Sequence, residues 1–145
     1  MRILVINGAN LDMLGIREPE IYGKRTYREL VRYIKAEMKR LGVKGRIVRS
    51  NYEGRIIEYI HSAYKKYDGI VINAGGYTHT SVSIADAIKA VSVPTAEVHL
   101  SDVNSREEFR KNSYISAVAE KTFSGKGFAG YTDALEYFAK EKAKN

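Results

Sequence analysis

Short aliphatic segments alternate with longer stretches of helical periodicity along most of this chain. The clearest short segments, Arg2–Ile6, Ile70–Asn73 and Thr95–Leu100, have the largely apolar character of strands that are buried on both faces. Parallel strands need crossover connections, and such connections are right-handed and usually helical. The alternation therefore predicts an α/β protein, a flavodoxin-like three-layer sandwich with a five-stranded parallel sheet.

The remaining elements follow from the same periodicities. A chain of 145 residues suits a single domain, residues 1–145, and no linker or internal repeat interrupts it. We expect helices near Tyr27–Leu41 (ending at Gly42), over Glu53–Lys66 (with Ile56, Ile57, Ile60 and Tyr64 facing inward), near Ser81–Val91 and near Thr132–Lys142, strands over Arg46–Ser50 and Val118–Ser124, and a helical turn over Arg106–Lys111.

Charge and composition limit the partners. The net charge is +7 at pH 7, but no basic block is interleaved with stacking aromatic residues, so the chain favours small anionic ligands over nucleic acid. Cys is absent, which excludes disulfides and thiol catalysis. No apolar run could cross a bilayer and no secretory signal precedes the first strand. We therefore expect no membrane partner and a cytoplasmic protein.

One connection is unusually long. Residues Asn7–Gly23 separate the first strand from the first helix, and loops of this length in compact domains are usually functional or disordered. Apolar anchors along the segment argue for order. We therefore expect an ordered lid that carries Asn7, Asn10, Arg17 and Tyr22 to a ligand. The apolar anchors are Leu11, Met13, Leu14, Ile16 and Ile21.

Polar residues follow three of the expected strands at the point where each strand ends. Asn7 and Asn10 follow the first strand, and residues 73–79 follow the third. His99 and Ser101 lie at the end of the fourth. Because the carboxyl ends of parallel strands meet at one edge, where α/β folds bind ligands, we expect these loops to form a single site.

Two pairs of residues could carry acid–base chemistry. Glu97 and His99 lie two apart in a strand and so share a face, where a carboxylate can fix an imidazole tautomer. The alternative is a structural hydrogen bond. On the lid, Arg17 and Tyr22 can meet, and a guanidinium favours the ionised form of a phenol that is otherwise a poor base. The alternative is that Arg17 binds a neighbouring glutamate while Tyr22 packs.

Other chemistries lack their sequence signals. The histidines are scattered without paired ligand spacing, so we expect no metal, and His61 reads as structural. Gly75-Gly76 belongs to neither phosphate-binding glycine motif and indicates close backbone approach to a polar ligand instead. No nucleophile elbow is present, and no lysine stands at a strand end for Schiff-base chemistry.

Taken together, the motifs resemble the type II 3-dehydroquinate dehydratases, and the resemblance covers nearly the whole chain as one catalytic domain. Ala9 and Ala74 stand where that family usually has proline, and Asp102 and Asn104 replace the more usual Asn and His. The motifs are NGAN (Asn7–Asn10), LGIREPEIYG (Leu14–Gly23), NYEG (Asn51–Gly54), GGYTHTS (Gly75–Ser81), EVHLS (Glu97–Ser101) and REEFR (Arg106–Arg110).

The resemblance implies dehydration of 3-dehydroquinate to 3-dehydroshikimate, with no cofactor, no metal and no covalent intermediate. Tyr22 would abstract the proton beside the ketone, with Arg17 stabilising its phenolate. A water near Asn10 would help hold the enolate. His99, oriented by Glu97, would protonate the departing hydroxyl.

The resemblance also implies the binding residues and the assembly. Asp86 would reach the site from a neighbouring subunit, in trimers that build a homododecamer. The step would serve either aromatic amino acid biosynthesis through the shikimate pathway or quinate breakdown. The rival hypothesis is a non-catalytic flavodoxin-like module that binds a small metabolite or nucleotide. The residues expected to bind substrate are Asn73, His79, Leu100, Ser101 and Arg110.

Overall fold

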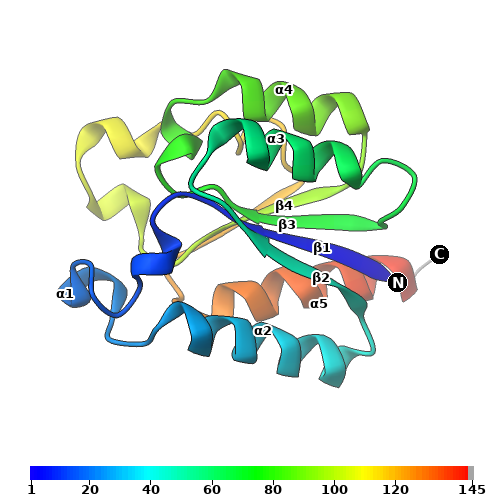
Figure 1. Cartoon of the computed structure of the whole chain (residues 1–145), viewed down its shortest axis with the longest axis horizontal. Helices are drawn as coiled ribbons and strands as arrows, with labels where there is room; N and C mark the ends of the chain where they lie inside the picture. The colour runs from blue at the N-terminus through cyan, green and yellow to red at the C-terminus, as the bar shows by residue number, and fades with distance from the viewer. Residues whose placement is uncertain (144–145) are drawn as a thin grey trace.

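The computed structural model describes residues 1–143 and has a sheet of five parallel strands in the order β2-β1-β3-β4-β5 (Figure 1). This order and direction confirm the expected α/β, flavodoxin-like fold. The chain reverses its direction of progress across the sheet after β2, which places the switch point between β1 and β3. The strands are β1 (Arg2–Asn7), β2 (Lys44–Arg49), β3 (Gly69–Asn73), β4 (Thr95–His99) and β5 (Lys121–Ser124).

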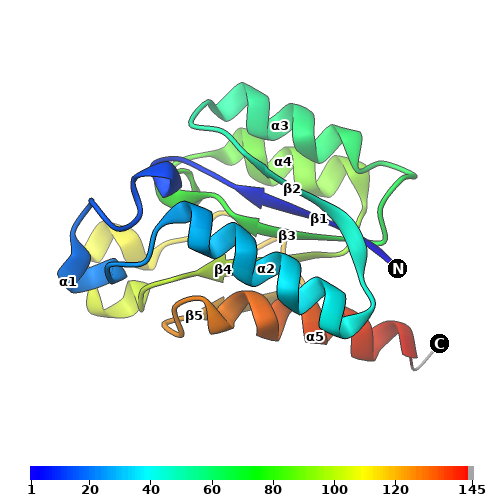
Figure 2. The ribbon, with the colours of Figure 1, turned by 60° about the horizontal axis from the view of Figure 1, so that its bottom comes forward.

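Helices cover both faces of the sheet. Figures 1 and 2 show α2 (Tyr27–Leu41) and α5 (Ala129–Ala143) side by side on one face, with α3 (Glu53–Ser62) and α4 (Val82–Val91) on the other. Five short helices lie in the connections. They are η1 (Leu11–Met13), α1 (Pro19–Tyr22), η2 (Gly75–His79), η3 (Val103–Ser105) and η4 (Glu108–Lys111). Among residues 1–143, no helix is both long and apolar enough to span a membrane.

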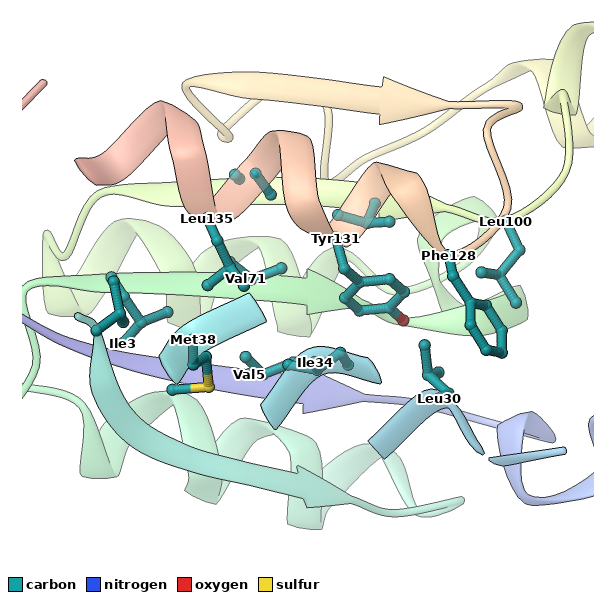
Figure 3. Packing of buried hydrophobic residues seen from close by; sticks show 14 of the residues in the cluster. Ile3, Val5, Leu30, Ile34, Met38, Val71, Leu100, Phe128, Tyr131 and Leu135 are labelled. Carbon is teal, nitrogen blue, oxygen red and sulfur yellow. The ribbon is translucent and has the colours of Figure 1, made fainter. Parts of the chain in front are cut away.

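The core between the sheet and the α2/α5 layer is continuous (Figure 3). Leu30, Ile34 and Met38 recur at intervals of four along α2, so they form one stripe that packs on the sheet. Leu30 and Ile34 are fully buried, and each contributes roughly 1.5–3 kcal/mol of hydrophobic stabilisation. Thr26 caps α2 by accepting a hydrogen bond of 3.2 Å from the Glu29 amide. Gly42 ends the helix at φ +68°, as expected.

Several element boundaries differ from the sequence predictions. The strand expected over Arg46–Ser50 spans Lys44–Arg49, and the helical turn expected over Arg106–Lys111 begins at Glu108. The helix expected over Glu53–Lys66 ends at Ser62 and continues as a turn in which Lys65 has φ +58°. Tyr64 therefore lies outside the helical stripe, and it is 53% exposed instead of facing inward. Strand β5 begins at Lys121, because Val118 lies in a turn that packs on the α3/α4 layer. Helix α5 begins three residues earlier than expected, at Ala129.

The lid is ordered by fewer anchors than expected. Leu11 and Leu14 are buried in the core beneath α2. Met13, Ile16 and Ile21 are exposed to solvent, so they do not anchor the segment as the sequence suggested. Two buried side chains and the short helices η1 and α1 hold the lid at the carboxyl edge of the sheet.

Candidate active site

A cavity of about 160 Å³ lies at the carboxyl edge of the sheet. Its wall is formed by the lid and by the residues that follow β1, β3 and β4, as the convergence of polar strand ends predicted. The structure thus brings most of the expected site residues around one space. Those that line it are Asn10, Arg17, Tyr22, Asn73, His79, His99, Leu100, Ser101 and Arg110.

Three residues expected at the site do not line this cavity: Glu97, Asp86 and Asn7, the last of which is described below. Glu97 is fully buried behind His99, with its Oε1 2.6 Å from His99 Nε2. The shared strand face predicted for this pair is therefore confirmed. Asp86 is exposed on α4 and lies outside the cavity of its own chain.

Glu97 is surrounded by hydroxyl groups. Its Oε1 accepts hydrogen bonds from Thr78 at 2.5 Å and Ser113 at 2.8 Å. Its Oε2 accepts from Ser116 and, at 3.1 Å, from Thr122. These hydroxyls come from three separate segments of the chain, so the carboxylate ties the loop after η4 to strands β4 and β5.

The pKa of Glu97 is low despite its burial. Burial by itself raises this pKa, but the hydrogen bond and charge of His99, with the hydroxyls of Ser116 and Thr78, lower it to about 2. The carboxylate is therefore ionised at neutral pH and can only accept. His99 Nε2 must donate to it, which leaves Nδ1 as the imidazole nitrogen available to a ligand.

His79 is the second imidazole at the cavity. Its Nδ1 lies 2.8 Å from the carbonyl oxygen of Asn112, and since a carbonyl only accepts, Nδ1 carries the proton. The His79 ring stacks near that of His99, with centroids 6.4 Å apart and planes 15° apart. Nε2 of His79 is then the nitrogen available to a ligand.

Arg17 and Tyr22 meet, as expected for the lid, but not through the phenol oxygen. The guanidinium carbon of Arg17 lies 4.8 Å from the centroid of the Tyr22 ring. Arg17 also forms an ion pair of 3.6 Å with Glu18, which was the structural alternative for this residue. Arg17 thus contacts the face of the ring and the neighbouring carboxylate together.

Arg106 is a site residue that the sequence reasoning placed only in a helical turn. Its guanidinium donates hydrogen bonds to the Tyr22 hydroxyl at 2.8 Å and to Ser101 Oγ at 3.4 Å. Its side chain is 9% exposed, and the hydrogen bond to Tyr22 raises its pKa. The REEFR motif contained this residue, but no spacing rule connects it to a tyrosine on a different loop.

Of the two lid asparagines, Asn10 lies at the cavity and Asn7 does not. Asn10 has φ +69°, and its backbone N–H donates to Asn51 Oδ1 at 2.9 Å. Asn10 is exposed and lines the cavity. Asn7 was expected to face a ligand, but it is fully buried and accepts a hydrogen bond of 2.6 Å from the Tyr131 hydroxyl. The reason is that Asn7 still belongs to β1, as its last residue, where the adjacent β3 and Tyr131 of α5 cover it.

A second, more open hollow of about 790 Å³ adjoins the cavity. Tyr22 and Arg106 line both spaces, so this hydrogen-bonded pair stands at the boundary between them. Within residues 1–143, no group of three or more His, Cys, Asp or Glu side chains could hold a metal ion.

Comparison with known proteins assigns the chain to a family. The family described as dehydroquinase class II matches residues 1–139. The chain belongs to this family. As a class II dehydroquinase it is an enzyme, a carbon–oxygen lyase, and this finding confirms the resemblance and argues against the non-catalytic module.

Three relatives match this chain along nine-tenths or more of their length. A 3-dehydroquinate dehydratase of Fusobacterium nucleatum is 53% identical over 140 residues, which are 94% of this chain and 95% of that one. One from Clostridium acetobutylicum is 50% identical over 131 residues, covering 90% of this chain and 91% of the relative. The type II dehydroquinase of Butyrivibrio crossotus superposes with a TM-score of 0.93 at 46% identity, covering 95% of this chain and 97% of that structure.

Proposed function

We propose that this class II dehydroquinase dehydrates 3-dehydroquinate to 3-dehydroshikimate, with Tyr22 as base and His99 as acid. The observation that carries the proposal is that both side chains line one cavity, each held by its own charged partner. Removal of a proton beside a ketone needs a base, a place for the developing oxyanion and an acid for the leaving group. Tyr22 and Asn10 on the lid and His99 at the end of β4 offer these three functions.

In the first step, the Tyr22 phenolate takes the proton from the carbon beside the ketone, and the electrons of that C–H bond form an enolate. Arg106 bonded to the phenol oxygen and Arg17 against the ring favour the anionic base. Asn10 stands at the cavity where it can hold the enolate oxygen through a water.

In the second step, the enolate re-forms the ketone and expels the hydroxyl from the neighbouring carbon. For this step His99 is protonated on both nitrogens: Nδ1 gives its proton to the departing hydroxyl, so that water leaves, while Nε2 keeps its proton in the bond to Glu97. Afterwards Tyr22 loses to solvent the proton that it took and His99 regains one, so both groups are restored with no net change in protons. No covalent bond to the enzyme is required.

The cavity also offers groups that suit the substrate's carboxylate and hydroxyls. Asn73, His79, Ser101 and Arg110 line it, together with the backbone of Leu100. The net charge of +7 favours the approach of an anion.

We further propose that Asp86 completes the site of a neighbouring subunit, in trimers that assemble as a dodecamer. Its exposed position on α4, away from the cavity of its own chain, supports this role. Light scattering of the purified protein, with Asp86→Ala as the variant, tests the assembly and the contribution of Asp86 separately. A monomer with full activity would contradict the proposal.

The deciding experiment is a direct assay of the conjugated enone product by its absorbance. We expect turnover with 3-dehydroquinate that persists in EDTA and survives borohydride added with substrate. Inactivation by borohydride would indicate an imine and overturn the enolate mechanism. Absence of any absorbance change would overturn the proposed reaction itself.

A further inference from the structure

Tyr131 is a buried phenol for which the proposed reaction has no use. It lies near the start of α5, it is fully buried, and it does not line the cavity. Figure 3 shows its side chain extending from α5 toward the sheet. Its hydroxyl bonds to two asparagines, Asn73 at 3.1 Å and Asn7 at 2.6 Å. These asparagines are register partners at the ends of β3 and β1.

The direction of each hydrogen bond in this group follows from one fixed donor. The backbone amide of Gly75 can only donate, and it lies 3.1 Å from the Asn73 side chain, so the atom it meets is Oδ1. Nδ2 of Asn73 is therefore turned toward Tyr131 and donates to the phenol oxygen. The Tyr131 proton must then go to Asn7 Oδ1.

The fixed donor is itself held in place by sterics. Gly75 has φ +61°, and a Cβ there would lie 2.5 Å from the carbonyl oxygen of Ala9. Only glycine fits this approach, so the position of the Gly75 amide is set by the backbone and not by the side chains around it.

The hydrogen-bond direction at Tyr131 leaves the side-chain nitrogen of Asn7 poorly paired. With Oδ1 of Asn7 occupied by Tyr131, Nδ2 of Asn7 is buried and makes no hydrogen bond of full geometry among the described residues, although its side chain also interacts with the Tyr27 hydroxyl. A buried donor without a full hydrogen bond destabilises the folded protein. Turning the Asn7 amide over would bring a second donor to the phenol oxygen and leave the Tyr131 proton without an acceptor.

The phenol stays protonated under all ordinary conditions. Burial raises the pKa of Tyr131 well above the usual phenol value, although the hydrogen bond from Asn73 opposes this. The hydroxyl is thus always able to donate to Asn7 and to accept from Asn73.

We propose that Tyr131 is a positioning residue. It holds the side-chain amide of Asn73 in the orientation that leaves an Nδ2 hydrogen, as a donor, facing the substrate. One hydrogen of Asn73 Nδ2 is used by Tyr131, and the other is left for the cavity, which Asn73 lines with 4% of its surface exposed. The donor would meet a hydroxyl or carboxylate oxygen of the substrate. This inference rests on the proposed function, because it assumes that Asn73 binds the substrate.

The test is a double-mutant cycle between Tyr131→Phe and Asn73→Ala, with kcat and KM measured for each variant. Tyr131→Phe should raise KM roughly tenfold with a smaller change in kcat, because the Asn73 amide, then held only at Oδ1 by Gly75, makes a weaker contact throughout the reaction. In the Asn73→Ala background, Tyr131→Phe should have no further effect. Additive losses, or an unchanged KM in the single variant, would overturn the inference.

Tyr33→Phe is the matched control. It removes another hydroxyl of the α2/α5 layer, bonded to Thr132 at 2.6 Å, with no connection to Asn73. Its kcat and KM should equal those of the wild type. If the wild type itself fails to turn over, the proposed function fails, and this outcome differs from active enzyme with an unresponsive Tyr131 variant.

A second variant covers the case in which Tyr131→Phe does not fold, which a thermal melt reveals. Asn7→Ala removes the acceptor of the Tyr131 proton, so the hydroxyl no longer has one fixed direction. It should also raise KM, and this rise should disappear in the Asn73→Ala background. A rise of the same size in both backgrounds would overturn the inference.

Discussion

Arg106 donates a hydrogen bond of 2.8 Å to the hydroxyl of Tyr22, a residue 84 positions earlier in the chain. Arg17, the partner expected from the lid sequence, lies instead over the face of the same ring. Both guanidinium groups lie over the Tyr22 ring, at 4.8 Å for Arg17 and 5.4 Å for Arg106, and Arg106 in addition reaches the oxygen that would carry the charge. Glu18 joins them, at 3.6 Å from Arg17 and 3.8 Å from Arg106.

The contact at the oxygen leads to a prediction for Arg106→Gln. We expect kcat to fall about 10²–10³-fold, as when one preorganised donor is removed from a developing charge, while the protein remains folded. Arg28→Gln, the same change on the exposed surface of α2, is the control and should leave kcat unchanged. Steady-state kinetics and circular dichroism measure both effects, and equal activity of the two variants would contradict the role of Arg106.

Tyr22→Phe should separate binding from chemistry. Removing the hydroxyl deletes the base, so kcat should fall roughly 10²–10⁴-fold, the range of general acid–base catalysis. Substrate binding should persist, because the ring that Arg17 contacts is retained. Isothermal titration calorimetry and the enone assay measure the two properties. Full turnover in this variant would remove Tyr22 from the mechanism.

Glu97→Gln should change the way in which stability depends on pH. The folded-state pKa of Glu97, about 2, lies below its ordinary value of 4.5, so its contribution is complete above about pH 4.5 and is lost as pH falls toward 2. The wild type should therefore be more stable than the variant at neutral pH, by roughly 1–3 kcal/mol, and this difference should shrink between pH 4.5 and 2.

Urea denaturation at a series of pH values measures this difference. Glu58→Gln provides the control, since Glu58 is a highly exposed residue of α3 whose ion pair with Arg55 contributes little. A stability gap for Glu97→Gln that is the same at pH 3 and pH 7 would show that the buried carboxylate is not held ionised by its partners.

The sequence could predict what local periodicity determines. Strand and helix order followed from the apolar pattern, and Glu97 and His99 came together because residues two apart in a strand share a face. The expected convergence of strand ends into one cavity is also observed. These features depend on spacing within one element or on the rules of parallel sheets.

What the sequence could not predict depends on contacts between distant segments. The bond from Arg106 to Tyr22 joins two loops without periodicity, and no local pattern indicates it. Asn7 has the polarity of a ligand contact, but Tyr131 on the last helix covers it and takes its side-chain oxygen. Tyr64 was misplaced because the helix ends before it, through a turn that the apolar pattern does not mark.

Gly45 and Gly54 differ in whether the surrounding structure leaves room for a Cβ atom. Gly45 pairs with Ile3 across β1 and β2 at φ +152°, and a Cβ there would lie 1.8 Å from the Ile3 carbonyl oxygen. Gly54 lies in the first turn of α3. A Cβ there would have no heavy atom of the described residues within 4 Å, apart from its chain neighbours and its own helix backbone. The two substitutions to alanine should therefore act in opposite directions.

Gly45→Ala should lower the free energy of unfolding by roughly 2–4 kcal/mol, because the edge strand must move away from β1 to admit the methyl group. Gly54→Ala should raise it by about 0.5–1 kcal/mol, since alanine restricts the unfolded chain and favours the helix. Thermal and denaturant melts of both variants measure these changes. Equal effects of the two variants would mean that β2 yields without cost, and then the close pairing of β1 with β2 would not be what holds this edge of the sheet.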